Sequence, residues 1–188
     1  EAVPSDAELV ARLPRLSQQP LTIRARLAEA GGSDLLRYRL LNGLASRSVI
    51  LDLPELFGGE ADATQALVRA VVERLTEEEN ALAARLARCE RAVSTREVEQ
   101  LGASAAVAAG LAEAGLLDGS AAQGRWLMHP FVRGVVAEVT SREGSFAHRA
   151  LAALEEERDP VRAHRHLIAA RDHNLALEVI ASAAYRLM

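Results

Sequence analysis

Residues 116–138, LLDGSAAQGRWLMHPFVRGVVAE, constrain the fold more than any other stretch of this sequence. Two apolar pieces, Leu116-Leu117 and Trp126-Leu127-Met128, flank small and turn-forming residues that include two glycines. This pattern predicts a β-hairpin, because glycine adopts the positive φ that such connections need. His129-Pro130 then ends the second strand, since proline cannot donate to a strand ladder, and the proline can begin a helix. The sequence therefore predicts a two-stranded wing followed at once by a helix.

Helix starts surround this hairpin. Capping boxes, in which a Ser or Thr is followed three residues later by Glu, begin at Ser5, Thr76 and Ser94. They predict a helix from Thr76 to Cys89 and a short one over 94–101, and Ser104 leads another that closes at Gly115. After the hairpin, apolar residues recur at helical spacing, at Phe131, Val135, Val136 and Val139. The order helix, helix, helix, wing, helix is that of a winged-helix domain.

The two flanks predict helices only. Residues 1–46 read as a small helical bundle, in which Pro20 opens the second helix and Ser33 caps a third that carries Leu36, Leu40 and Leu44. Residues 49–57 are a junction, either strand or helix, and 62–75 are helical. After a hinge at 141–144, helices over 146–158, 160–170 and 172–187 have the length of tetratricopeptide-like hairpins. We therefore predict a mostly α fold with three domains: a lid-like bundle over 1–46, the winged helix over 47–141 and a superhelix beginning at 145–188.

Composition limits the classes of protein. With 188 residues, 49% of them hydrophobic, the chain can bury a core, and no apolar run approaches the roughly 20 residues of a membrane span. We expect a cytoplasmic fragment of a longer parent, because the sequence starts at Glu1 without a leader and holds too few hairpins for a complete superhelix. A lone cysteine, Cys89, excludes an intrachain disulfide and suits a buried thiol. A net charge of -4 gives no overall reason to bind nucleic acid or an anionic membrane.

Several short motifs occur in a fixed order from the predicted winged helix into the helical array. They are residues 76–82 (TEEENAL), 115–117 (GLL), 126–133 (WLMHPFVR), 148–150 (HRA), 159–163 (DPVRA) and 169–172 (AARD). Together they resemble the middle of a STAND-type NTPase, a class of large signal-transduction ATPases that includes many bacterial LuxR-type and antibiotic-regulatory transcription activators. The resemblance implies an upstream P-loop domain, a helical lid, a winged helix and a superhelical sensor arm.

The resemblance also implies two nucleotide-sensing residues in the parent. His129 would donate to the β-phosphate of ADP held by the P-loop domain, and Pro20 would belong to the Gly-x-Pro stretch of the lid. Here that stretch reads Gln18-Gln19-Pro20 and lacks the glycine. The parent would bind ATP or ADP with Mg²⁺ and self-associate when open. This chain contains no lysine and hence no Gly-x-x-x-x-Gly-Lys-Ser/Thr loop, so we expect no cofactor and no ATP hydrolysis by the chain alone.

Three alternatives compete with this hypothesis. A DNA-binding winged helix needs cations on the helix before the wing, yet residues 104–115 contain none, and over 94–125 two arginines against four carboxylates leave a net charge of -2. A protein interaction module without nucleotide control is the second. An independent enzyme is the third, but the carboxylate pairs Glu77-Glu78 and Glu155-Glu156 are expected on solvated helix faces, and no catalytic triad is visible.

Single residues also have structural interpretations. His129 can simply close the strand and bond a local carbonyl group. A metal site would have to use His148, His164, His166 or His173. His164 and His166 lie two residues apart on one predicted helix and point about 200° apart around it, so they cannot share one ion. We therefore predict no metal and no catalytic residue in this chain.

Overall fold

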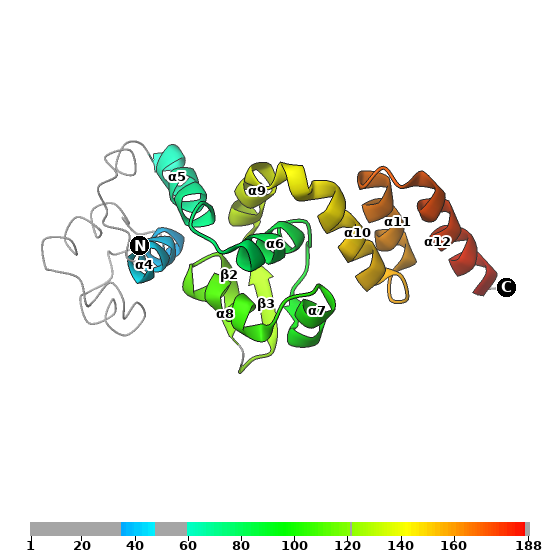
Figure 1. Ribbon diagram of the computed structural model, residues 1–188, viewed down its shortest axis with the longest axis horizontal. Helices are drawn as coiled ribbons and strands as arrows, with labels where there is room; N and C mark the ends of the chain where they lie inside the picture. The colour runs from blue at the N-terminus through cyan, green and yellow to red at the C-terminus, as the bar shows by residue number, and fades with distance from the viewer. Residues whose placement is uncertain (1–34, 48–59, 121, 187–188) are drawn as a thin grey trace, which may run out of the picture.

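The computed structural model describes residues 35–47, 60–120 and 122–186. Within these ranges the chain is mostly helical with one small antiparallel sheet (Figure 1). The prediction of a mostly α fold is confirmed. The α-helices are α4 (Leu35–Ser46), α5 (Glu60–Val72), α6 (Glu77–Leu86), α7 (Thr95–Gln100), α8 (Ala105–Glu113), α9 (Pro130–Val139), α10 (Gly144–Glu155), α11 (Pro160–Ala169) and α12 (His173–Arg186). The strands are β1 (Val93–Ser94), β2 (Leu117–Ser120) and β3 (Arg125–Met128). No helix in the described ranges combines the length and apolar character needed to cross a lipid bilayer.

Side-chain caps begin the central helices where the sequence predicts them. Both halves of the capping box are formed at Thr76, before α6, and at Ser94, before α7, while the Ser104 hydroxyl accepts from the Val107 N–H at 3.3 Å. The predicted C-terminus of α6 is wrong, because the helix ends at Leu86 and not at Cys89. The chain has to leave the helix there so that Val93 can reach the sheet.

The predicted hairpin is confirmed and gains a third strand. β3 lies between β1 and β2 and is antiparallel to both, with Leu117 opposite Met128 and Val93 opposite Trp126. The two-stranded wing of the prediction was therefore too small. β1 is only two residues long and pairs with a strand more than thirty positions away, so no local pattern marks it.

One hydrophobic core joins the sheet to most of the helices. It contains Trp126, which is 1% exposed, together with residues of α5, α6, α8 and α9, and also Leu40, Leu41 and Leu44 of α4. The apolar stripe predicted for α9 was partly wrong. Its buried residues are Val132, Val135 and Val136, because these face α5 and α6, whereas Phe131 and Val139 are each 41% exposed.

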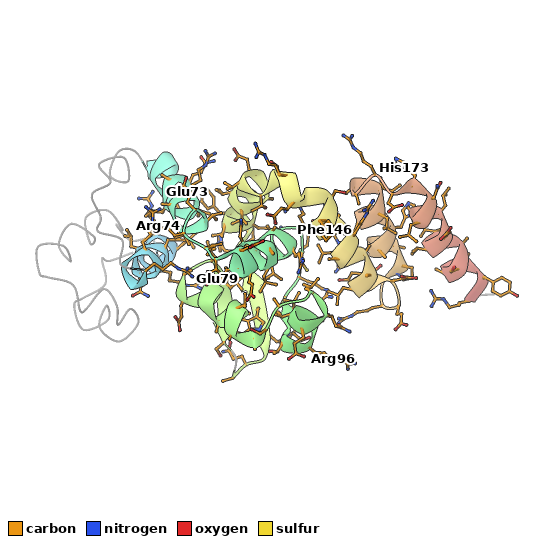
Figure 2. All side chains as sticks on the ribbon, viewed as in Figure 1. Glu73, Arg74, Glu79, Arg96, Phe146 and His173 are labelled. Atoms are coloured by element: carbon orange, nitrogen blue, oxygen red, sulfur yellow. The ribbon has the colours of Figure 1, made fainter. Side chains whose placement is uncertain are left out.

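α4 is fastened to this core by polar contacts as well. Glu79 of α6 (Figure 2) accepts hydrogen bonds at both carboxylate oxygens, at 2.6 and 3.0 Å, from Arg47, the residue after α4. Arg39 forms an ion pair with Asp118 of β2. The leucines and these two arginines therefore hold α4 against the same body as the sheet.

Helix α10 belongs to two cores. Leu151 lies in the main core, while the next residue, Ala152, lies in a second, smaller one with Ala163 and Leu167 of α11 and Ala176 and Val179 of α12. In Figure 1, α10, α11 and α12 stand side by side at one end of the molecule. A 3₁₀ turn, Ser141–Glu143, leads straight from α9 into α10 at the place where the sequence suggests a hinge.

Candidate functional site

His129 occupies the junction between β3 and α9 and is exposed. Its ring Nδ1 accepts a hydrogen bond from the Phe131 backbone N–H at 3.2 Å, which caps the N-terminus of α9. The local partner is thus an N–H group and not the carbonyl suggested by the structural interpretation. Because Nδ1 acts as the acceptor, the proton of the neutral imidazole is on Nε2. This assignment leaves an N–H donor that no described residue engages.

The exposed residues that flank His129 along the chain are apolar. Along β3 the side chains alternate, so that Trp126 and Met128 are buried and Leu127 is 39% exposed. Pro130 is exposed as well, and Phe131 is 41% exposed. The His129 donor therefore has exposed apolar side chains beside it, and a charged pair also lies near, because Asp118, the strand partner of Leu127, is paired with Arg39. Pro20, the other predicted nucleotide-sensing residue, lies outside the described residues.

A network of ion pairs lies where the segment before β1, helix α7 and the end of α10 meet. Arg91 donates to Glu97 of α7 at 2.7 Å and to Glu155 at the end of α10 at 2.8 Å, and Arg158 reaches the same Glu97 oxygen at 2.8 Å. The Glu155 side chain is 3% exposed and that of Glu97 13%. These contacts connect the sheet, α7 and the end of α10, so we refer to Arg91, Glu97, Glu155 and Arg158 as the junction network.

Contacts within the junction network shift the pKa values of Glu97 and Arg91. Burial alone would raise the pKa of Glu97, but hydrogen bonds from Arg91 and Ser94 outweigh burial and lower that pKa to about 2. Burial acts to lower the pKa of Arg91, and its two carboxylate partners raise it. Glu97 and Arg91 therefore stay ionised over the physiological pH range. The expectation that Glu155 and Glu156 both lie on a solvated helix face is wrong for Glu155, which faces Arg91 and is buried. Glu156 is exposed.

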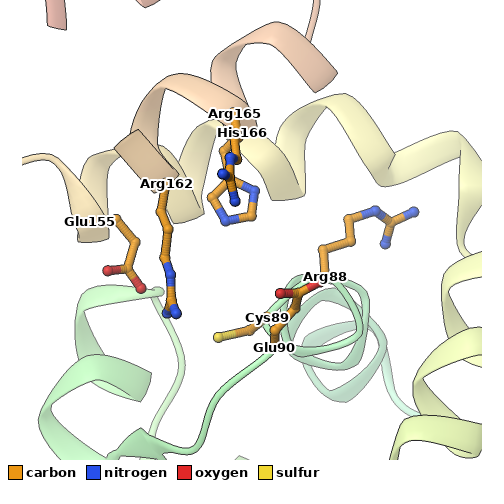
Figure 3. A pocket seen from close by; sticks show the side chains of 7 residues that line it. All are labelled: Arg88, Cys89, Glu90, Glu155, Arg162, Arg165 and His166. Carbon is orange, nitrogen blue, oxygen red and sulfur yellow. The ribbon is translucent and has the colours of Figure 1, made fainter. Parts of the chain in front are cut away.

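A small pocket of about 160 Å³ separates the end of α6 from α11 (Figure 3). Its lining residues are Arg88, Cys89, Glu90, Glu155, Arg162, Arg165 and His166. Cys89 is buried there, and its Sγ lies 3.6 Å from the Arg91 carbonyl oxygen. Burial raises the pKa of the thiol, so the neutral form persists at neutral pH. The prediction of a buried thiol at Cys89 is confirmed.

A pair of histidines, His148 and His166, lies at this pocket, and His166 is one of its lining residues. Nδ1 of His148 on α10 lies 3.0 Å from Nδ1 of His166 on α11, whereas His164 bonds the Ala176 carbonyl oxygen at 2.9 Å. Burial, and for His148 also the charge of its neighbour, lowers the pKa of both paired imidazoles. His164 and His166 thus point to different partners, as their spacing predicts. Among the described residues no group of three or more His, Cys, Asp or Glu side chains has a metal-binding arrangement.

Comparisons with protein-family models, with curated proteins and with solved structures each gave no match. A function can therefore be argued only from the residues and their geometry. Two features can carry a functional argument. One is the exposed imidazole of His129, which is flanked by apolar side chains, and the other is helix α10, which contributes to two cores. Sequence reasoning singled out His129 but missed the junction network, whose partners Arg91 and Glu155 are 64 positions apart.

Proposed function

We propose that this chain is the regulatory segment of a nucleotide-dependent signal-transduction regulator of the STAND type. In this proposal α6 to α9 with the sheet form the winged helix, and α10 to α12 begin a tetratricopeptide-like sensor arm. The segment couples the nucleotide state of a P-loop domain, elsewhere in the parent, to that arm. The observation that carries the proposal is the double membership of α10, whose adjacent residues Leu151 and Ala152 lie in different cores.

Coupling requires a rigid connection between the winged helix and the arm. Arg88, just after α6, donates to the Thr140 hydroxyl at 3.2 Å and to the carbonyl oxygens of Ala137 and Thr140 at 3.3 and 3.0 Å, so it holds the end of α9 where α10 follows. The junction network holds the other end of α10. Because packed cores move as rigid bodies, a displacement of the winged helix carries the arm with it. A domain docked on the winged helix therefore changes the position of the arm.

His129 supplies the nucleotide-dependent contact. Its Nε2–H faces outward and would donate to the β-phosphate of ADP in the neighbouring P-loop domain, where a charge-assisted bond is stronger than a neutral one. Leu127 and Phe131 would be covered by that domain in the closed form. ATP would favour an open form that self-associates, so nucleotide exchange shifts the population between two states.

Two substitutions at His129 separate the cap from the phosphate contact. His129→Ser keeps a side-chain cap but cannot reach a phosphate, whereas His129→Ala removes both functions. In the full-length parent both should speed ADP release about tenfold and raise inducer-independent activity, because each removes a contact made in the closed state only. In this chain Ser should leave the melting temperature near that of the wild type, and Ala should cost about 1 kcal/mol. ADP release that is unchanged by His129→Ser would refute the phosphate contact.

DNA binding by the same winged helix is the main alternative to this proposal. α8 would enter the major groove, and it carries no cationic side chain. The buried Ala108 and Leu111 face the core, and the helix is rich in alanine, which suits close packing against another helix. The composition of α8 therefore favours contacts within a protein over contacts with a phosphate backbone.

A further inference from the structure

A larger pocket, of about 460 Å³, lies beside the junction network. Its polar lining comes from four arginines on different segments, Arg91 before β1, Arg96 on α7, Arg125 on β3 and Arg158 after α10, together with Ser94, Gln100 and one carboxylate, Glu97. We call it the arginine pocket. Its volume is in the range of small-molecule sites, and its lining differs from the apolar walls of most of them.

The charges of this pocket are not balanced. Arg91 and Arg158 are neutralised by Glu97 and Glu155 through the contacts described above. Arg96 and Arg125 are exposed, and neither side chain has a hydrogen bond or an ion pair with any of the described residues. Two positive charges therefore remain uncompensated at one pocket.

Backbone pairing brings these two arginines together. Arg125 lies opposite Ser94 in the sheet, and the N–H of Thr95, the residue before Arg96, donates to the Gly124 carbonyl oxygen at 3.1 Å. Arg96 also stands in the first turn of α7, where the helix dipole disfavours a cation. Neither guanidinium group is held by a hydrogen bond or an ion pair within the described part of the chain, so both are available to a ligand.

We propose that the arginine pocket binds a small organic phosphate as its dianion. Planar guanidinium groups match phosphate oxygens in a bidentate manner, and the two free arginines match the charge of a phosphate monoester. The Gln100 amide, exposed at the pocket, offers donors and an acceptor to the neutral part of the ligand. A long polyanion fits less well, because residues 94–125, which supply both free arginines, carry a net charge of -2.

Such a ligand would touch both sides of the junction. Arg96 and Arg125 belong to the sheet side, and Arg158 follows α10. A bound phosphate would therefore tighten the contact between the sheet and the end of α10. The inference is independent of the proposed nucleotide coupling, because it concerns binding by this chain alone at a pocket that does not contain His129.

Titration calorimetry of the 188-residue chain with ribose 5-phosphate at low ionic strength tests the proposal. We expect saturable binding at one site, weakened about tenfold or more in the Arg96→Gln/Arg125→Gln variant. The control, Arg165→Gln/Arg186→Gln, removes the same charge from two other exposed arginines and should change the affinity less than about twofold. Melting temperatures of both variants verify folding, and Arg96→Gln alone serves if Arg125 proves necessary for the strand.

Four results would overturn the proposal. The first is no saturable binding of ribose 5-phosphate, and the second is an equal loss of affinity in the control variant. The third is tighter binding of citrate, which would indicate a carboxylate site. The fourth is tight, saturable binding of duplex DNA that the Arg96→Gln/Arg125→Gln variant abolishes, which would make the pocket part of a nucleic-acid surface.

Discussion

Arg91 is the residue on which the junction depends most. One guanidinium group serves two carboxylates, Glu97 and Glu155, and its fixed fork of donors allows both bonds at once. Lysine, with a single ammonium centre, would not reproduce this geometry. Removal of Arg91 leaves Glu155, whose side chain is 3% exposed, without its cation, so the network is sensitive to substitution at this position.

We predict that Glu155→Gln destabilises the chain by about 2 to 3 kcal/mol, because Arg91 loses an ionised partner in a site that is 3% exposed. Glu156→Gln is the matched control, since the neighbouring carboxylate is exposed, and it should change stability by less than about 0.5 kcal/mol. Urea unfolding followed by circular dichroism measures both. Equal effects of the two substitutions would show that the buried pair contributes nothing.

At the scale of elements, predictability follows the distance along the chain over which a signal acts. The starts of α6, α7 and α9 were predictable because a cap or a proline acts within three residues. β1 was not, since its two residues are a strand only through their pairing with β3. In the same way Glu155 is indistinguishable from the exposed Glu156 in sequence, and only the distant Arg91 makes it a buried residue. The apolar residues that flank His129 can be read from the sequence. Their exposure could be predicted only in part, from the alternation of buried and exposed side chains along β3, and the rest comes from the structure.

Two helical glycines give an element-scale prediction about α4. A Cβ at Gly43 would collide with the backbone of Ala114 at the end of α8, whereas a Cβ at Gly134 on α9 would meet nothing within 4 Å. Gly43→Ala should therefore separate α4 from α8 and cost about 2 kcal/mol, since backbone atoms cannot move aside. Gly134→Ala should instead stabilise the chain by about 0.5 to 1 kcal/mol through helix propensity. Urea unfolding compares them, and a stabilising Gly43→Ala would contradict the close packing of α4.

The whole molecule combines two cores of unequal size. The main core joins α4 to α10 around the sheet, whereas the second consists of five residues, three of them alanines, shared by α10, α11 and α12. Because little apolar surface is buried in the second core, α11 and α12 should open at lower free energy than the rest. The histidine pair lies at this weaker end, so the two parts of the molecule should respond differently to acid.

Acid should act on the arm before it acts on the main body. The pKa of His148 and of His166 is lowered from 6.5, so below pH 6.5 the unfolded chain binds protons that the fold excludes, and stability is lost as the pH falls. Arg88 and Arg162 oppose protonation of the pair, while Glu90 and Glu155 favour it at His166. The carboxylates Glu79 and Glu97 of the main body have lowered pKa values and lose their contribution only below pH 4.5.

Between pH 6.5 and 4.5, amide hydrogen exchange, corrected for its intrinsic pH dependence, should therefore rise first in α11 and α12 and not in α6 or β3. His166→Leu removes one titrating partner and should flatten this response. His173→Gln, at an exposed histidine of α12, should leave it unchanged. If acid opens both parts together, or if His166→Leu keeps the wild-type response, the histidine pair does not control the arm. The outcome bears on the proposed coupling, because α11 and α12 could not transmit a movement of the main body if they opened independently of it.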